Sequence, residues 1–182
     1  FFMLTGELMT SATITDRLVA LSRALIGRIR GGLAQVNVLV SMFFAGMNGS
    51  VVADTATVGA LVLPAMKKAG YPAAFSAAVT GVSSTIGGII PPSIMMIVLA
   101  NATEISIASL FAAGIVPGIL IGVVIMVINH YFAVKYNFER SDEPFSVRRA
   151  GKELYRSSFA LLIPLVLVGS VMGGVASVVE AG

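Results

Sequence analysis

The chain of 182 residues contains no cysteine, and only 12% of its residues are charged. Without cysteine it has neither a disulfide framework nor a thiolate metal site. A soluble domain carries about 25% charged residues, whereas this chain is 57% hydrophobic and has a mean hydropathy of +0.94. One small globule cannot bury this much apolar surface, so the composition predicts a protein whose solvent is lipid.

The basic residues fall into three clusters separated by long apolar stretches. Only Asp54 interrupts the first stretch, and only Glu104 interrupts the second. The positive-inside rule places all three clusters on the cytoplasmic side, so a stretch that joins two of them must enter the membrane and return. The clusters are Arg17, Arg23, Arg28 and Arg30; Lys67 and Lys68; and Lys135, Arg140, Arg148, Arg149, Lys152 and Arg156.

The stretch 31–66 joins two cytoplasmic ends and has the turn-forming tripeptide Asn48-Gly49-Ser50 at its middle. Each arm has about 16 residues and a helical length of about 25 Å, slightly less than the roughly 30 Å of a hydrocarbon core. This pattern predicts a re-entrant helical hairpin. The alternative is an ordinary pair of short transmembrane helices with an exposed turn.

Residues 72–100 are expected to cross outward, and residues 109–134 are expected to cross back. The middle of the outward segment, residues 83–93, contains two adjacent glycines and two adjacent prolines, which break helical hydrogen bonding. Broken backbone at membrane depth is tolerated only where protein or a watered cavity satisfies it. The outward segment is therefore predicted to be a discontinuous helix. The returning segment carries glycines four residues apart, a pattern typical of close helix packing, at Gly114, Gly118 and Gly122.

Polar segments lie on either side of this region. Residues 14–30 combine apolar residues at helical spacing with arginines, which predicts an interfacial helix. Residues 139–157 are predicted to form a cytoplasmic loop followed by a second interfacial helix. Residues 158–178 are predicted to cross the membrane again. The chain begins without methionine and is expected to be an internal segment of a longer protein.

The hairpin tip and the interrupted helix are the elements that predict chemistry. Secondary transporters build ion and substrate sites from such pieces, because half-helix N-termini offer N–H groups to anions and unwound carbonyls offer oxygen to cations. We expect a sodium ion at Ser50, Ser84 and Thr85. The candidate sodium- and substrate-binding residues are Asn48, Gly49, Ser50, Ser83, Ser84, Thr85, Gly87, Gly88 and Pro91.

Asp54 is the only ionisable residue of the predicted hairpin arms. A carboxylate inside the membrane is a candidate functional group. It lies one helical turn beyond Ser50 and can therefore face the tip. Direct sodium ligation is one interpretation. The interpretation we prefer is a supporting role, in which the carboxylate accepts hydrogen bonds from neighbouring groups behind the ion ligands.

Several long stretches resemble the large membrane subunit of TRAP (tripartite ATP-independent periplasmic) transporters. Residues 46–54 and 64–71 are similar to that family's hairpin signature, and residues 83–93 are similar to its central broken helix. Further similar stretches are residues 6–9, 30–37 and 110–118. The resemblance therefore extends over nearly the whole chain.

The resemblance implies an all-α, multi-pass protein of the bacterial inner membrane that acts as half of an elevator-type transporter. Residues 1–30 would form a scaffold helix end and an interfacial arm. Residues 31–134 would form the first repeat of the transport domain, with a hairpin at 31–68, a broken helix at 72–100 and a helix at 109–134. Residues 135–157 would form a cytoplasmic loop and interfacial helix, and residues 158–182 a truncated scaffold helix.

The function implied is sodium-coupled import of an organic acid such as a dicarboxylate, a sialic acid or a keto acid. The implied partners are a small four-helix membrane subunit, a periplasmic substrate-binding protein and the lipid bilayer, with no nucleic acid. No cofactor is expected other than sodium as the coupling ion, and no enzymatic activity is expected.

Three other functions are weighed against this one. A stand-alone sodium/dicarboxylate-type symporter of related fold shares the hairpin arrangement but needs no binding protein. An intramembrane serine hydrolase would use Ser50 with His130, although these residues are predicted at different membrane depths. A scaffold or assembly protein that does not transport would not need two broken elements at membrane depth.

Overall fold

A computed structural model describes residues 14–26, 29–138 and 147–173, and in these residues every regular element is a helix. The expected end of a scaffold helix before residue 14 and the end of the last predicted crossing, after residue 173, lie outside the described residues. The helices are α2 (Ile14–Ile26), α3 (Gly32–Asn48), α4 (Val51–Lys68), α5 (Ala73–Ser84), the 3₁₀ helix η1 (Thr85–Gly88), α6 (Ile94–Thr103), α7 (Ile107–Lys135) and α8 (Val147–Met172).

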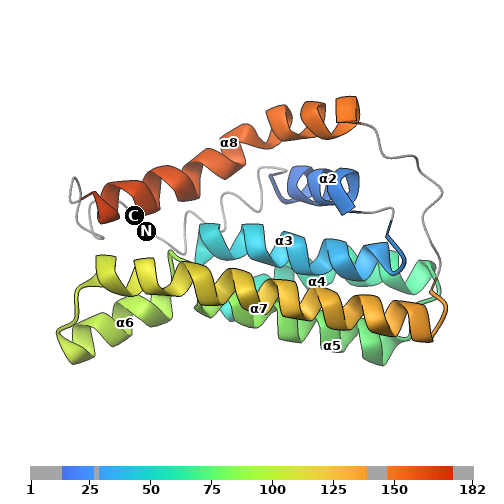
Figure 1. Cartoon of the computed structure of the whole chain (residues 1–182), viewed down its shortest axis with the longest axis horizontal. Helices are drawn as coiled ribbons and strands as arrows, with labels where there is room; N and C mark the ends of the chain where they lie inside the picture. The colour runs from blue at the N-terminus through green and yellow to red at the C-terminus, as the bar shows by residue number, and fades with distance from the viewer. Residues whose placement is uncertain (1–13, 27–28, 139–146, 174–182) are drawn as a thin grey trace.

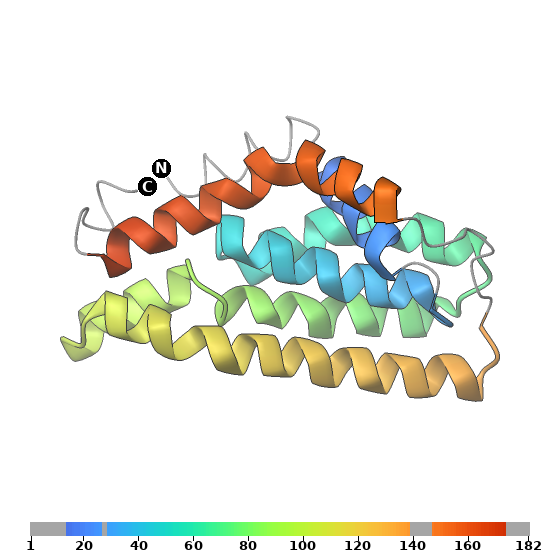
Figure 2. The ribbon, with the colours of Figure 1, turned by 45° about the horizontal axis from the view of Figure 1, so that its top comes forward.

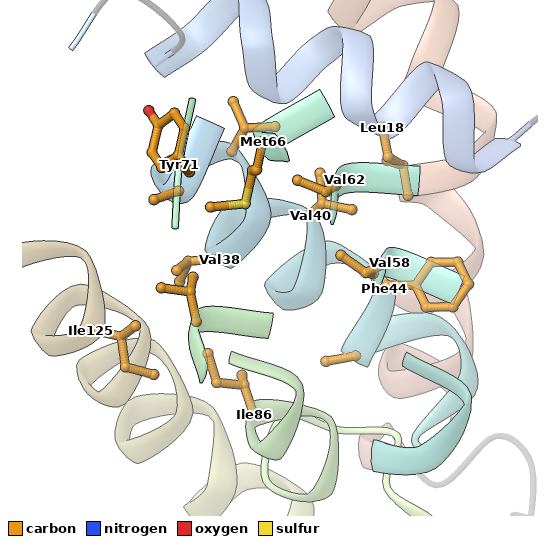
Figure 3. Packing of buried hydrophobic residues seen from close by; sticks show 14 of the residues in the cluster. Leu18, Val38, Val40, Phe44, Val58, Val62, Met66, Tyr71, Ile86 and Ile125 are labelled. Atoms are coloured by element: carbon orange, nitrogen blue, oxygen red, sulfur yellow. The ribbon is translucent and has the colours of Figure 1, made fainter. Parts of the chain in front are cut away.

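Helix α3 lies at the centre of the fold. It contacts α2, α4, α5, α7, η1 and α8, and Figure 2 shows α2 and α8 on one side of it and α5 and α7 on the other. The core forms along its length. Val40 and Phe44 lie beside Val62 and Val58 of α4, whereas Val38 lies on the side of α3 that faces Ile125 of α7 (Figure 3). Leu18, Ile86 and Ile125 bring α2, η1 and α7 into the same cluster.

The tripeptide at residues 48–50 forms the turn that the sequence predicts. Gly49 ends α3 in the left-handed conformation (φ 58°), and its N–H donates to the carbonyl of Ala45 at 3.2 Å. Ser50 is extended, and its hydroxyl accepts from the N–H of Ala53 at 3.4 Å, which caps α4. Helices α3 and α4 therefore form a hairpin, with residues 48–50 at its tip.

The interruption predicted in the next segment is also present. Helix α5 ends at Ser84, η1 continues to Gly88, and α6 begins only at Ile94. The hydroxyl of Ser93 accepts from the N–H of Met96 at 3.4 Å and donates to the carbonyl of Gly88 at 2.8 Å. Ser93 thus caps α6 and ties its start to the end of η1, so the two halves of the broken segment are held together.

Helix α4 and helix α7 end in the same way. After α4, Gly70 is left-handed (φ 79°), and the N–H of Tyr71 donates to the carbonyl of Met66 at 3.1 Å. After α7, Asn137 is left-handed (φ 52°), and the N–H of Phe138 donates to the carbonyl of Ala133 at 3.0 Å. Both ends are Schellman motifs, in which glycine or asparagine adopts the left-handed conformation that satisfies the last carbonyls.

The two motifs meet. The rings of Tyr71 and Phe138 lie with centroids 4.6 Å apart. Arg30, just before α3, donates to the side-chain oxygen of Asn137 at 3.3 Å. The two ends of the α3–α4 hairpin therefore lie beside the C-terminal end of α7, as Figure 1 also shows. Segments from all three basic clusters are brought to one end of the fold, in agreement with their predicted common side.

Helix α7 packs through its glycines, as the sequence predicts. A Cβ atom at Gly118 would lie 2.5 Å from Cγ1 of Ile90, and one at Gly122 would lie 2.5 Å from the sulfur of Met42. At Gly114 a Cβ would overlap the side chain of Met96. The broken segment and α3 thus approach the α7 backbone closely. Within the described residues, α7 is the one helix long and apolar enough to cross a membrane by length and composition.

Helix α8 runs without a break from Val147 to Met172, across the boundary expected between an interfacial helix and a separate crossing at 157/158. It packs on α2. The Ser157 hydroxyl donates to the Arg17 carbonyl at 3.2 Å, and the Arg17 guanidinium donates to the Arg156 carbonyl at 3.2 Å. Each helix therefore donates one side-chain hydrogen bond to the backbone of the other.

Candidate site at the hairpin tip and the broken helix

The hairpin tip lies against the start of α6. The N–H of Ile94 donates to the carbonyl of Gly49 at 3.3 Å. A Cβ atom at Gly49 would overlap the carbonyl oxygen of Pro92 and lie 3.0 Å from Cα of Ser93. Only glycine fits here, because the position requires both a left-handed backbone and close approach of another backbone.

The 3₁₀ segment closes on the same tip from a second direction. A Cβ at Gly87 would lie 3.7 Å from the carbonyl carbon of Ser50, and one at Gly88 would lie 3.4 Å from Cγ2 of Val51. The structure therefore brings the two interruptions predicted from the sequence into direct contact. Helices α4 and α6 both begin at this point. Each helix start carries a partial positive charge and N–H groups without an intrahelical acceptor.

A buried polar network lies behind the tip, between α3 and α5. The amide nitrogen of Asn37 donates to the Thr80 hydroxyl at 2.7 Å, and the Thr80 hydroxyl donates to the Ser76 carbonyl at 2.9 Å. The hydroxyls of Ser41 and Ser83 are 3.2 Å apart. All these side chains are buried, so their hydrogen bonds form in an apolar surrounding, where an unpaired polar group is costly.

Asp54 lies at the end of this network. Its side chain is fully buried, and neither carboxylate oxygen accepts a hydrogen bond that meets normal geometry from a described residue. The nearest polar groups are the hydroxyls of Ser84 and Ser41. Helices α3 and α5 and the η1 segment, which pack against α4, contain no charged residue.

Burying an ionised carboxylate costs several kcal/mol when no cation accompanies it. Asp54 lies in the first turn of α4, where the helix dipole stabilises a negative charge by up to about 2 kcal/mol. The dipole therefore offsets only part of the cost. The Asp54 carboxyl group is therefore either neutral or, where it is ionised, stabilised by hydroxyl groups such as those of Ser41 and Ser84 or by a positive charge.

The predicted sodium ligands differ in their surroundings. Ser84 is buried, and its hydroxyl donates to the carbonyl of Thr80 at 2.8 Å. Thr85 is exposed, and its hydroxyl donates to the carbonyl of Val82 at 2.7 Å. Ser50 is half-buried at the helix cap. The other candidates are Ser83, Gly87 and Pro91, which are buried; Gly49, which is buried at the tip; Gly88, which is half-buried; and Asn48, whose side chain is not described.

Sequence reasoning missed Asn37, Ser41, Thr80 and Ser93. Asn37 and Ser41 are four residues apart, as are Thr80 and Ser84, so each pair lies on one face of its helix. Polar residues at helical spacing within apolar helices were the available signal. The partner of each residue depends on tertiary packing, so the sequence pattern alone did not identify the pairs.

The serine hydrolase alternative is wrong in its geometry. His130 is exposed, and its neighbour Asn129 donates to the carbonyl of Ala34 at the start of α3. Ser50 lies beyond the other end of α3, which has 17 residues and a length of about 26 Å. A serine and a histidine must be within hydrogen-bond reach to act as nucleophile and base.

The whole chain, residues 1–182, matches the family described as the DctM component of tripartite ATP-independent periplasmic transporters. It is 38% identical over 181 residues to a C4-dicarboxylate TRAP transporter large permease protein of Pseudomonas aeruginosa, 37% identical to a sialic acid TRAP transporter permease protein of Haemophilus influenzae, and 36% identical to a 2,3-diketo-L-gulonate TRAP transporter large permease protein of Escherichia coli. All of this chain is covered in each comparison, but only 42%, 29% and 43% of these relatives. The chain thus spans less than half of their length.

Proposed function

We propose that this chain, which belongs to the DctM-component family of TRAP transporters, forms the first half of a sodium-coupled transport domain. The relatives are transport permeases and not enzymes. The observation that carries the proposal is the contact between the hairpin tip and the broken helix, where the Ile94 N–H donates to the Gly49 carbonyl. Sites of this construction hold ions and substrates in secondary transporters.

The membrane arrangement follows from helix lengths. Helix α3 has 17 residues and α4 has 18, so each is about 26 Å long and slightly too short to cross a hydrocarbon core of roughly 30 Å. Helix α7 has 29 residues and a length of about 43 Å. The hairpin is therefore re-entrant in our proposal, with its tip inside the membrane and its two ends on the cytoplasmic side.

The sodium ion is proposed to bind where the tip and the break meet. The candidate ligands are the hydroxyls of Ser50, Ser84 and Thr85 together with carbonyl oxygens of the broken segment. Neutral oxygen atoms suit a weakly held hard cation. Asp54 is proposed to act behind these ligands, because it lies beside the Ser84 hydroxyl and is fully buried. In that place its charge favours a nearby cation without contacting it.

The substrate is proposed to be an organic acid anion. The names of the relatives specify a C4-dicarboxylate, sialic acid, 2,3-diketo-L-gulonate and isethionate, and each of these compounds carries an acidic group. The starts of α4 and α6 meet beside the break, and helix N-termini favour anions through their N–H groups and dipoles. The structure offers two such termini at one place.

The remaining parts of the proposal concern the whole protein. We propose that it acts in the inner membrane with a small membrane subunit and a periplasmic binding protein, and that this half moves with its substrate against a scaffold. One of the relatives is a permease named DctMQ, and the chain covers 28% of it. Whether the small subunit is fused or separate is a property of the full polypeptide.

The test is uptake by the full-length protein in proteoliposomes with its small subunit and binding protein, with and without an inward sodium gradient. We expect uptake to require both sodium and the binding protein. Ser50→Ala should raise the sodium concentration for half-maximal uptake. Ser76→Ala is the control, because the Ser76 hydroxyl also forms a local hydrogen bond near a helix start, to the Pro72 carbonyl, but lies away from the tip. Uptake without the binding protein would instead support the stand-alone symporter.

A further inference from the structure

One end of the fold, which lies on the cytoplasmic side in the proposed arrangement, carries four exposed basic residues. We call them the basic end: Arg30, Lys67, Lys68 and Lys135. All four side chains are exposed. Lys67 and Lys68 lie in the last turn of α4, and Lys135 lies in the last turn of α7. Positive charges at these places are favoured by the negative ends of the two helix dipoles.

Packing fixes the segments of the basic end to one another. The ring of Tyr71, just after α4, lies 4.6 Å from that of Phe138, just after α7. Phe75 extends this cluster, with its ring 5.1 Å from Phe138. Arg30 is joined to the same place through its hydrogen bond to Asn137. The charges therefore lie on segments that two Schellman motifs and packed aromatic rings hold together, and not on independent loops.

No acidic side chain that the structure describes balances this charge. The acidic side chains that the structure describes are Asp54, buried in the first turn of α4; Glu104, at the end of α6; and Glu153, which pairs with Arg156 on α8. The other six acids of the sequence, among them Asp16 and Glu139, lie outside the described side chains. Asp54 is 13 residues from Lys67 along one helix, a separation of about 20 Å. That separation is far beyond the roughly 4 Å or less of an ion pair, so Asp54 does not pair with Lys67.

Aromatic side chains surround the basic end at the level expected for a membrane interface. Tyr131 and Tyr136 are exposed near the end of α7, and the ammonium of Lys135 lies 5.7 Å from the centre of the Tyr136 ring. Tyrosine and lysine together at a helix end are typical of the headgroup region, where a ring contacts acyl chains while the charge meets phosphate.

We propose that the basic end binds the headgroups of anionic glycerophospholipids in the cytoplasmic leaflet. Its charge is complementary to phosphate, its lysines lie beside interfacial tyrosines, and no described acid competes for it. Anionic lipid bound there would favour the position of the moving half in which the ends of the hairpin lie at headgroup depth. The inference rests on the proposed membrane arrangement but not on sodium coupling or on the identity of the substrate.

The test uses the full-length permease with its small subunit, purified in detergent. Native mass spectrometry measures binding of phosphatidylglycerol in competition with phosphatidylcholine. The double variant Lys67→Gln/Lys135→Gln is compared with Arg148→Gln/Lys152→Gln, which removes the same charge from exposed positions of α8. Each basic residue near an anionic membrane surface strengthens binding by about fivefold. Lys67→Gln/Lys135→Gln removes two such residues, so we expect it to bind phosphatidylglycerol roughly 25-fold more weakly.

The α8 variant should lose clearly less affinity than Lys67→Gln/Lys135→Gln, because Arg148 and Lys152 belong to the same basic cluster as Lys135 but lie on α8 and not on the aromatic base of the basic end. An equal loss in both variants would show a response to net charge alone and would overturn the proposal. Unchanged binding in Lys67→Gln/Lys135→Gln, or equal competition by phosphatidylcholine, would overturn it as well. The readout is lipid binding and not uptake. A transporter that fails to couple to sodium would therefore leave this result interpretable.

Discussion

Gly49→Ala is the substitution that most directly perturbs the proposed site. The residue has φ 58°, and its new Cβ would overlap the carbonyl oxygen of Pro92. A left-handed alanine costs about 1 kcal/mol relative to glycine. Backbone cannot move aside as a flexible side chain can, so the tip must separate from α6 and lose the hydrogen bond from Ile94 to Gly49. That bond contributes about 1 kcal/mol.

Together these terms disfavour the closed tip by about 2 kcal/mol, or roughly 30-fold in population. If sodium binds only to the closed tip, in which Gly49 contacts α6, the sodium concentration for half-maximal uptake should rise by up to the same factor. The assay is sodium-dependent uptake by the full-length protein in proteoliposomes. Expression and thermal unfolding are measured in parallel, because the change should be local to the tip.

Gly70→Ala provides a matched control. Gly70 also has a positive φ of 79°, but a Cβ there meets nothing within 4 Å. It therefore imposes the same backbone strain without a clash, and it lies at the opposite end of α4. We expect its sodium dependence to stay close to wild type. Equal behaviour of the two variants would refute the argument that contact between the tip and α6 controls sodium binding.

Three further predictions concern the surroundings of the site. Asn37→Leu removes the hydrogen bond to Thr80 and leaves the buried Thr80 hydroxyl without that donor. The full-length protein should therefore lose about 1–3 kcal/mol of stability in a thermal or denaturant unfolding assay. An unchanged stability would contradict a stabilising role for the buried polar network. Gly118→Val should separate α7 from Ile90 and lower the melting temperature, and a wild-type value would argue against close packing there. Asp54→Asn should keep the fold and weaken sodium affinity by about tenfold, as for a residue behind metal ligands; complete loss of sodium binding would instead make the carboxylate a direct ligand.

Local chemistry explains which parts of the fold could be predicted from the sequence. The turn at Gly49 follows from the tripeptide around it, because glycine permits the left-handed conformation and serine caps the next helix. The break before Ile94 follows from adjacent glycines and prolines. The packing face of α7 follows from glycine spacing, with Gly118 against Ile90.

Features that depend on tertiary contacts were not predicted. The bond from Asn37 to Thr80 joins residues 43 positions apart, and no local signal specifies such a pair. The ring contact between Tyr71 and Phe138 depends on the ends of α4 and α7 lying side by side. Helix α8 passes straight through the predicted boundary near Ser157, because the change from polar to apolar sequence occurs within a continuous helix.

The candidate site was predicted in outline and not in detail. The sequence identified both interruptions, and their contact is present between Gly49 and Ile94. It grouped Ser84 and Thr85 as equivalent ligands, although Ser84 is buried beside Asp54 and Thr85 is exposed. The difference arises because consecutive residues at a helix end point about 100° apart around its axis, so only one of them faces the hairpin.

The most direct test of the central claim is disulfide cross-linking between the tip and the broken helix in the full-length protein, freed of any other cysteine. The pair Val51→Cys and Gly88→Cys suits this test, because a Cβ at Gly88 would lie 3.4 Å from Cγ2 of Val51. A γ atom of residue 51 is where a cysteine there would carry its sulfur, so the two sulfur atoms can approach the roughly 2 Å of a disulfide bond. We predict that the cross-link forms, that sodium accelerates its formation, and that uptake is lost and then restored by reductant. Absence of the cross-link would contradict the contact itself, and a cross-linking rate indifferent to sodium would contradict the sodium site built on it.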